Sequence, residues 1–517
     1  MLTNAMASTL LAALPLLVIV LLMLAAKWSA AKAGTVGVIV AWFLAWRGFG
    51  YGQRVYHEVG PVMATAGAFA EALFTAGTIV WIIFPALCIY QLQVRTGAIE
   101  VLRLALARLS PDPRLVAVIV AWFFALFIEG AAGFGTTVAL AAPLLVSLGF
   151  RPVQAVTVAL IGHAVGVSFG AVGTPVLPQV AATGLSALAL SRANGVYHSL
   201  LGWVMLGFVM AIVMKSVHGQ GQTTQSIWGW AFLAAVCFLL PYFTLSRWVG
   251  PELPTLGGAL CGGVGFVVLL KLVGRDTVTP SPTHETSSHH AGDVLRAALP
   301  YMLLVGFVLV TRLLAPLKQL LTAVVWEWSW LGLFGGNIQP LYHPGTMLFA
   351  AFLLGAGWQR APFSDLTAAM GQAARQLGLV TVALIAMLGL SRLMVHAGMI
   401  TTLATAASTI AGETWPFWAP FVGILGTFVT GSATASNILF SDFQQATAQH
   451  LGLPVLTMAG AQGFGASVGN IICPHNIIAG GATVGLSGQE GAILQRTLWA
   501  CLTYAILGGL LTLAMTR

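Results

Sequence analysis

Residues 166–175 read GVSFGAVGTP and residues 465–474 read GASVGNIICP, so Gly, Ser, Gly and Pro recur at the same four places 299 residues apart. Two further landmarks keep nearly this spacing: Gly130 and Gly431 are 301 residues apart, and Pro152 and Pro454 are 302 residues apart. Three landmarks in one order at an almost constant distance indicate an internal duplication. The chain is therefore expected to fold as two structural repeats.

The spacing Gly-x-Ser-x-Gly is also that of a hydrolase nucleophile elbow, in which the serine lies on a sharp turn between a strand and a helix. Here both copies lie in long apolar runs without strand character. An enzyme would also rarely need two elbows at equivalent places. A membrane-embedded serine hydrolase that uses Ser168 or Ser467 is therefore a remote alternative, and we do not expect an enzyme.

The composition indicates a membrane protein. Charged residues make up 7% of the 517 residues, against roughly 25% in a typical soluble domain, and hydrophobic residues make up 58%. So few charges cannot cover a surface that faces water, and lipid is the remaining solvent. The apolar runs are too long for barrel strands, and lipid tolerates no unpaired backbone groups, which leaves helices. We therefore expect an all-α polytopic membrane protein with about 11–14 transmembrane helices.

Charge and cysteine usage narrow the possible partners. The net charge of +8 comes from basic residues in short clusters between apolar runs, which is typical of cytoplasmic loops and predicts no nucleic-acid partner. One such connection, expected on the cytoplasmic side, holds Arg95, Arg103, Arg108 and Arg114. The five cysteines show no paired spacing, so we expect neither a disulfide framework nor a metal site. The chain has no P-loop, so no ATPase is expected within it, and no cofactor is expected either.

A polar linker, residues 274–293, divides the chain into an N-terminal half, residues 1–273, and a C-terminal half, residues 294–517. Both halves contain glycine- and proline-rich interruptions of apolar runs. These predicted breaks lie near 129–137 and 162–175 in the first half and near 430–437 and 462–476 in the second. Interruptions at corresponding places are typical of secondary transporters, which bind substrate at the bilayer midplane. We expect broken helices or re-entrant hairpins in two repeats that are inverted.

The breaks supply the candidate substrate-binding residues. Freed N–H groups and the positive ends of half-helices at such breaks can hold an anion. For Gly166 and Gly170, close helix packing is an equally good interpretation. The candidates are Gly130, Gly133, Gly135, Thr136, His163, Ser168, Gly431, Ser432, Thr434, Ser436, Asn437, Gln462, Ser467, Asn470 and His475.

Four stretches resemble the lactate permease family, and the similarity runs from about residue 72 to the C-terminus. They are FIEGAAGFGTTVALAAPLLVSLGF (127–150), GAVGTP (170–175), TGSATASNILF (430–440) and GNIICPHNIIAGGATVGLSGQEG (469–491). The resemblance implies proton-coupled transport of L-lactate, D-lactate or glycolate across a bacterial inner membrane. It also shows departures, because the family commonly has Asp where this chain has Ala433 and Lys where it has Asn470. Ser168, His163 and His475 are not features of the family, so we expect a divergent branch.

Ionisable residues inside apolar runs are functional candidates, because an unpaired charge in lipid costs several kcal/mol. Glu129 matches the family motif and is proposed as the site of the coupling proton or its structural neighbour, since desolvation favours the neutral form of a carboxyl. Asp442 is a second candidate for proton coupling or for a pair with a basic residue. Arg392 is a possible clamp for a carboxylate. Arg312, near a helix end, is expected to extend towards the interface instead.

Taken together, these patterns predict a secondary transporter that imports a small monocarboxylate, a 2-hydroxy acid such as lactate or glycolate, by proton symport. Its expected partners are the organic anion, protons and the lipid bilayer. A sodium-coupled carrier of another organic anion is the alternative, because carbonyls and hydroxyls of unwound segments also suit Na⁺. The sequence leaves the oligomeric state open.

Overall fold

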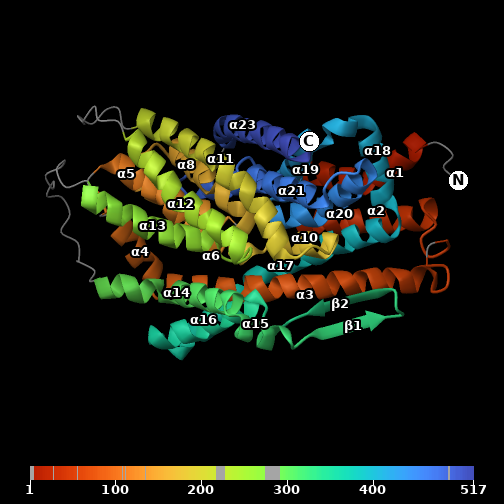
Figure 1. The fold of residues 1–517 in the computed structure, drawn as a ribbon, viewed down its shortest axis with the longest axis horizontal. Helices are drawn as coiled ribbons and strands as arrows, with labels where there is room; N and C mark the ends of the chain where they lie inside the picture. The colour runs from red at the N-terminus through yellow and green to blue at the C-terminus, as the bar shows by residue number, and fades with distance from the viewer. Residues whose placement is uncertain are drawn as a thin grey trace.

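The computed structural model describes residues 5–517 except 27, 55, 108, 111, 134, 217–226, 274–290 and 487–488. Most of the predicted linker therefore lies outside the described residues, and only 291–293 are seen, at the start of a helix. The described chain is helical apart from one β-hairpin, which confirms the predicted class (Figure 1).

The first half consists of helices of very different lengths. A π-helical segment, Ile119–Phe124, joins α5 to α6, and a 3₁₀ segment, Ala164–Phe169, follows α8. The helices are α1 (Ala5–Leu24), α2 (Ala30–Gly48), α3 (Gly60–Arg95), α4 (Ala98–Ala107), α5 (Pro113–Val118), α6 (Ala125–Ala131), α7 (Thr136–Ser147), α8 (Pro152–His163), α9 (Gly170–Gly173), α10 (Val176–Thr183), α11 (Ala187–Ser216), α12 (Trp228–Trp248) and α13 (Pro254–Val273).

The second half adds the hairpin. Its elements are α14 (Ala291–Leu313), α15 (Ala315–Thr322), β1 (Trp326–Trp330), β2 (Phe334–Ile338), α16 (Pro344–Trp358), α17 (Phe363–His396), α18 (Met399–Ala411), α19 (Trp415–Thr430), α20 (Ala433–Leu451), α21 (Val455–Gly469), α22 (Pro474–Thr483) and α23 (Glu490–Thr516), with a 3₁₀ turn at Gly412–Thr414.

Ten helices among the described residues are long and apolar enough to cross a membrane, and two shorter apolar helices accompany them. The sequence predicted about 11–14 crossings. The difference arises where predicted segments fall on short helices that turn back inside the molecule. Large apolar side chains such as Val62 and Ile410 are 77% and 86% exposed, as expected for a surface in contact with lipid.

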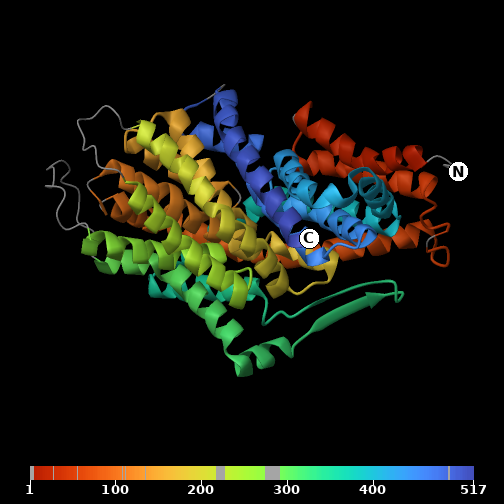
Figure 2. The same ribbon diagram turned by 45° about the horizontal axis from the view of Figure 1, so that its top comes forward.

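Helices α3 and α17 are the longest and run antiparallel side by side (Figures 1 and 2). At one end, Arg95 Nε lies 3.8 Å from Asp365 Oδ1. At the other end, the Tyr56 hydroxyl lies 2.8 Å from His396 Nδ1. The two helices therefore form a continuous support along the molecule.

Two helical hairpins turn back at the predicted breaks. In the first, α6 ends at Ala131 and α7 begins at Thr136, with positive φ at Gly133 (57°) and Gly135 (80°) between them. In the second, α19 ends at Thr430 and α20 begins at Ala433, with Gly431 at φ 77°. Glycine suits these turns because a left-handed backbone costs it no steric strain.

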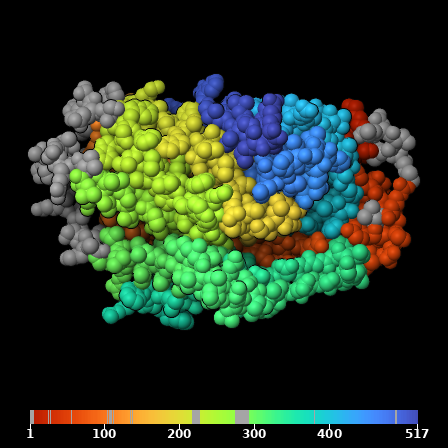
Figure 3. All heavy atoms as spheres, viewed as in Figure 1, coloured from red at the N-terminus to blue at the C-terminus, as the bar shows by residue number. Residues whose placement is uncertain are grey.

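The β-hairpin was not predicted. Strands β1 and β2 pair antiparallel with Trp328 opposite Gly336, and the hairpin lies outside the helical body (Figures 1 and 2). A side chain on Gly336 would meet the Phe74 ring of α3 at 2.7 Å, so glycine permits this close approach. The space-filling view shows the segment from α14 to β2 along one edge of the molecule (Figure 3).

Candidate functional site: a cavity between the breaks

All four predicted breaks contribute residues to one small cavity of about 40 Å³. A cavity of this size holds a few water molecules. Its lining residues are Glu129, Gly133, Gly135, Val167, Gly170, Ala171, Pro175, Gly431, Ser432, Ala433, Thr434 and Asn470. Seven of the residues proposed from the sequence therefore lie together: Glu129, Gly133, Gly135, Gly431, Ser432, Thr434 and Asn470.

Glu129 is a buried carboxyl on the last turn of α6. Its Oε2 accepts a hydrogen bond of 2.7 Å from the Thr137 hydroxyl on α7. Its Oε1 lies so close to Gly170 that an added methyl group there would overlap it. None of the ion pairs between described residues involves Glu129. The carboxyl is thus held beside the cavity without a compensating cation.

The N-terminal end of α20 faces the same cavity. Ser432 caps this helix by accepting from the Ala435 N–H at 3.3 Å. The N–H groups of Ala433 and Thr434 belong to the first turn, which has no intrahelical acceptor. They therefore present donors and the positive end of the helix dipole to the cavity. Helix α7 begins beside it in the same way, although the side chain of Thr136 lies outside what the structure describes.

Asn470 connects the cavity to a buried histidine. Its Oδ1 accepts from Asn476 Nδ2 at 2.9 Å and lies 3.1 Å from His163 Nε2. The other ring nitrogen of His163 lies 2.7 Å from the Ala159 carbonyl oxygen. Both ring nitrogens thus lie within hydrogen-bond distance of oxygen atoms. His163 itself does not line the cavity; it contacts the site through Asn470.

The two serines of the repeated motif hold the halves together. Ser168 donates to the Gly463 carbonyl at 3.1 Å, and Ser467 donates to the Ala164 carbonyl at 2.6 Å. These contacts are reciprocal, because Ala164 and Gly463 are also 299 residues apart. Both serines are buried and neither lines the cavity, so their contact with substrate stays a prediction.

The glycines of the motif are explained by packing. An added methyl group on Gly166 would meet Leu126 at 2.6 Å, and one on Gly465 would overlap the Pro420 carbonyl oxygen. Gly130 also packs against backbone, where an added methyl group would lie 2.5 Å from the Leu256 nitrogen. Gly130, also proposed to bind substrate, packs against α13 and does not line the cavity.

Three polar residues of the second half lie behind the cavity wall instead of in it. Gln462 Nε2 contacts the Ser436 hydroxyl at 3.3 Å and Asn437 Oδ1 at 3.4 Å. Asn437 Nδ2 donates to the Pro175 carbonyl at 2.8 Å, which ties α20 to the first half. All three residues are buried and contact other protein groups without lining the cavity, so substrate binding by them stays a prediction. His475 is exposed beside Gly431 and also lies outside the cavity.

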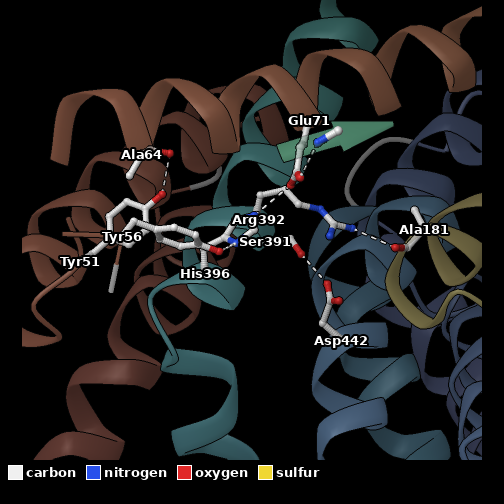
Figure 4. A network of polar contacts seen from close by, with 10 residues as sticks. Tyr51, Tyr56, Ala64, Glu71, Ala181, Ser391, Arg392, His396 and Asp442 are labelled. Atoms are coloured by element: carbon white, nitrogen blue, oxygen red, sulfur yellow. Dashed lines mark hydrogen bonds and ion pairs between the residues drawn. The ribbon is translucent and has the colours of Figure 1, made fainter. Parts of the chain in front are cut away.

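The remaining proposed residues, Asp442 and Arg392, lie elsewhere (Figure 4). Asp442 Oδ2 accepts from the Ser391 hydroxyl at 2.9 Å and lines no described cavity. Arg392 donates to the Ala181 carbonyl at 3.3 Å and lines a second, larger cavity. Arg392 therefore lies away from the cavity between the breaks, and its role as a carboxylate clamp stays a prediction.

This larger cavity, here called the vestibule, has a volume of about 720 Å³ and is bordered by α3, α10, β2 and the α12–α13 connection. It contains two pairs that the sequence did not predict. In the first pair, Arg312 Nη2 lies 2.5 Å from Glu252 Oε1, and the guanidinium carbon of Arg312 lies 3.6 Å from the centre of the Tyr342 ring. The side chains of Arg312 and Glu252 are both buried, so the predicted extension of Arg312 to the interface is wrong. Glu71 Oε2 lies 2.9 Å from His396 Nε2. Such pairs join distant segments, so no local sequence signal identifies them.

His343, at the start of α16, also borders the vestibule. Burial, and next the positive charge of Arg312, lower the pKa of His343 to about 4. Its Nδ1 accepts from the Gly345 N–H at 3.3 Å, which requires an unprotonated nitrogen. His343 is thus uncharged at neutral pH.

A strained segment separates the two cavities. Ala171 lines the small cavity, whereas Val172 and Gly173 line the vestibule. Ala171 and Val172 both have positive φ, 42° and 56°. This conformation is rare for alanine and more so for a β-branched residue. The surrounding contacts must therefore hold the segment in place.

The helical fold, the apolar outer surface and the enclosed polar cavity define a membrane transporter. The profile of the L-lactate permease family matches residues 8–517, so the chain belongs to this family. It is 29% identical to the L-lactate permease of Escherichia coli K12, over 98% of this chain and 96% of that protein. It is also 29% identical to the glycolate permease GlcA of that strain, over 87% of each chain.

Among solved structures, MtrF of Neisseria gonorrhoeae superposes with a TM-score of 0.48 at 14% identity, covering 88% of this chain and 83% of that one. The relatives are permeases from bacteria, so the chain is a multi-pass protein of a bacterial inner membrane and not an enzyme. The serine-hydrolase alternative is therefore wrong. It transports substrates of the lactate type.

Proposed function

We propose that this chain imports a small 2-hydroxy monocarboxylate, such as lactate or glycolate, by proton symport, and that the substrate binds in the cavity between the breaks. The family and the names of its relatives support the substrate class. The single observation that carries the site is that all four breaks line one cavity. Because this cavity is small, its walls must separate to admit a three-carbon acid.

The groups around the cavity suit a carboxylate with a neighbouring hydroxyl. The free N–H groups at the start of α20 and the positive end of its dipole can hold the carboxylate without a buried arginine. The hydroxyls of Ser432 and Thr434 and the side-chain amide of Asn470 can bind the 2-hydroxyl. Because Ala433 and Asn470 carry no charge, the positive ends of the helices supply the main electrostatic attraction for the substrate carboxylate.

Glu129 supplies a reason for proton coupling. An ionised Glu129 would repel a substrate carboxylate in the same water-poor cavity, whereas a protonated Glu129 would not. Substrate binding then favours protonation, and by linkage a proton favours substrate binding. His163 and Asp442 are further proton sites under this proposal, His163 through its contact with Asn470.

The arrangement of the hairpins supports inverted repeats. The arms α5 and α20 lie in opposite parts of the molecule, and the tips of both hairpins reach the same cavity (Figure 1). The reciprocal bonds of Ser168 and Ser467 also relate the halves as equivalent partners. We infer alternating access, in which each hairpin in turn opens the cavity to its own side.

The first prediction concerns coupling. In proteoliposomes, a proton gradient should drive accumulation of labelled L-lactate or glycolate, and Glu129→Gln should reduce it at least tenfold while counterflow exchange persists. A permanently neutral side chain removes the charge repulsion but cannot carry the proton. The matched control is Glu413→Gln, which changes an exposed glutamate outside the site and should leave accumulation unchanged.

Two results would contradict the proposal. Undiminished, pH-dependent accumulation by Glu129→Gln would remove Glu129 from coupling. Accumulation driven by a sodium gradient and indifferent to pH would overturn proton symport altogether.

A further inference from the structure

We propose that the vestibule contains a separate outer binding station for a carboxylate anion and that Arg392 binds the anion there. The inference rests on the proposed function, because it concerns the route by which a monocarboxylate reaches the central cavity. It assigns Arg392 to a step before the breaks, at a place that the sequence did not identify.

Among the charged side chains that border the vestibule, Arg392 is a partly buried cation without an ion-pair partner. Seven titratable side chains border the vestibule: Glu71, Glu252, Arg312, Lys318, Tyr342, His343 and Arg392. Glu252 forms an ion pair with Arg312, and Glu71 contacts His396, which compensates its charge when the histidine is protonated. Lys318 is exposed. None of the ion pairs between described residues includes Arg392.

The hydrogen bonds of Arg392 are also incomplete. One guanidinium nitrogen donates to the Ala181 carbonyl at 3.3 Å. Its Nε is buried and has no partner among the described residues. Figure 4 shows the side chain between the Glu71–His396 pair and the Ser391–Asp442 pair, pointing towards Ala181. A carboxylate matches the two-pronged donor geometry of a guanidinium, so an anion in the vestibule would complete these bonds.

The position of the vestibule suits a step before the central cavity. Its floor includes Val172 and Gly173, and the preceding residue, Ala171, lines the small cavity. A movement of this segment would therefore open a route for an anion from one cavity to the other. The vestibule also borders the start of α11 and the α12–α13 connection, at the ends of α11 and α13 that lie opposite the basic residues Lys215 and Lys271. By the positive-inside rule, it faces the outside of the cell.

Uptake kinetics give the first test. Arg392→Gln should raise the KM for uptake about tenfold and change Vmax less than twofold, because the charge captures substrate but does not take part in translocation. Arg392→Lys, which keeps the charge without the two-pronged geometry, should give a smaller rise and serves as the test if the glutamine variant does not fold. Arg375→Gln, at an exposed position of the same helix, should match the parent protein. An unchanged KM in both Arg392 variants would overturn the proposal.

Cysteine labelling gives a test that does not need transport. Thr75 borders the vestibule one helical turn from Glu71, so Thr75→Cys reports on the local potential when the exposed Cys261 is replaced by serine. An anionic methanethiosulfonate should react faster than a cationic one, and Arg392→Gln should lower this ratio at least fivefold. L-lactate or glycolate should slow labelling only when Arg392 is present. An unchanged ratio of anionic to cationic labelling rates in Arg392→Gln would contradict the outer binding station.

The two proposals fail separately. Arg392-dependent labelling and protection without any gradient-driven uptake would support the outer station and contradict symport. Normal symport with labelling that does not depend on Arg392 would support the central site and contradict the outer station.

Discussion

At the scale of single residues, Ala433 and Asn470 show how the cavity can lack the charges that its family resemblance implies. A lone buried aspartate or lysine would be costly, whereas loss of both partners of an ion pair is close to neutral. Asn470 retains polar contacts with Asn476 and His163. The substitutions are therefore compatible with a site in which helix ends and amide groups replace an ion pair.

Backbone strain at Ala171 leads to a second single-residue prediction. Ala171→Gly should raise the free energy of unfolding by about 1 kcal/mol, because glycine adopts φ 42° without steric cost and only a methyl group is lost. Ala155→Gly, at a buried position of α8, should instead lower it by about 1 kcal/mol. Thermal unfolding in detergent measures both. Destabilisation by Ala171→Gly as large as that by Ala155→Gly would show that the segment is not strained.

The sequence predicted the identity of the central site better than the direction of its side chains. Glu129, Gly133, Gly135, Gly431, Ser432, Thr434 and Asn470 were selected because glycine and polar residues interrupt apolar runs, and all of them line the cavity. Ser168, Ser467 and Gln462 do not line it, because their segments are buried on all sides and no apolar stripe indicates which face points to the cavity. The vestibule pairs were missed because they join segments far apart in the chain.

At the scale of elements, close helix packing decides how the breaks are held. Gly465 of α21 contacts the backbone of α19, whose far end forms the second hairpin tip. A helix pair this close has no space for even a methyl group. The β-hairpin was missed for a different reason, since tryptophans in a membrane protein are also explained by packing at the membrane–water interface.

This packing predicts a large effect of one methyl group. Gly465→Ala should lower the free energy of unfolding by about 3 kcal/mol or prevent folding, because the new Cβ would overlap a backbone oxygen that cannot turn aside. Gly207→Ala, on α11, adds a methyl group with no described atom within 4 Å and should change stability by less than about 1 kcal/mol. Thermal unfolding and size-exclusion profiles in detergent compare the two. Equal stability of both variants would contradict the close packing.

At the scale of the whole molecule, α3 and α17 fix which ends of the helices lie on the same side. The contact of Arg95 with Asp365 places the C-terminal end of α3 beside the N-terminal end of α17. The contact of Tyr56 with His396 places the N-terminal end of α3 beside the C-terminal end of α17. The basic connection after α3 then predicts that the C-terminal end of α3 lies on the cytoplasmic side. The vestibule lies beside the middle of α3, and its proposed opening is to the opposite, outer side.

Sidedness is therefore the last prediction, and it bears on both proposals. With Cys261 replaced by serine, Glu58→Cys should react with a membrane-impermeant maleimide in intact cells, because exposed Glu58 precedes the outer end of α3. Ser364→Cys, at the exposed start of α17, should react only after the membrane is opened. The reverse labelling pattern would show that the vestibule opens to the cytoplasm. Arg392 would then bind substrate after translocation, before its release, and not at the start of uptake. In that case, Arg392→Gln would raise the KM for efflux instead of the KM for uptake. Efflux kinetics therefore give an independent measurement of the orientation.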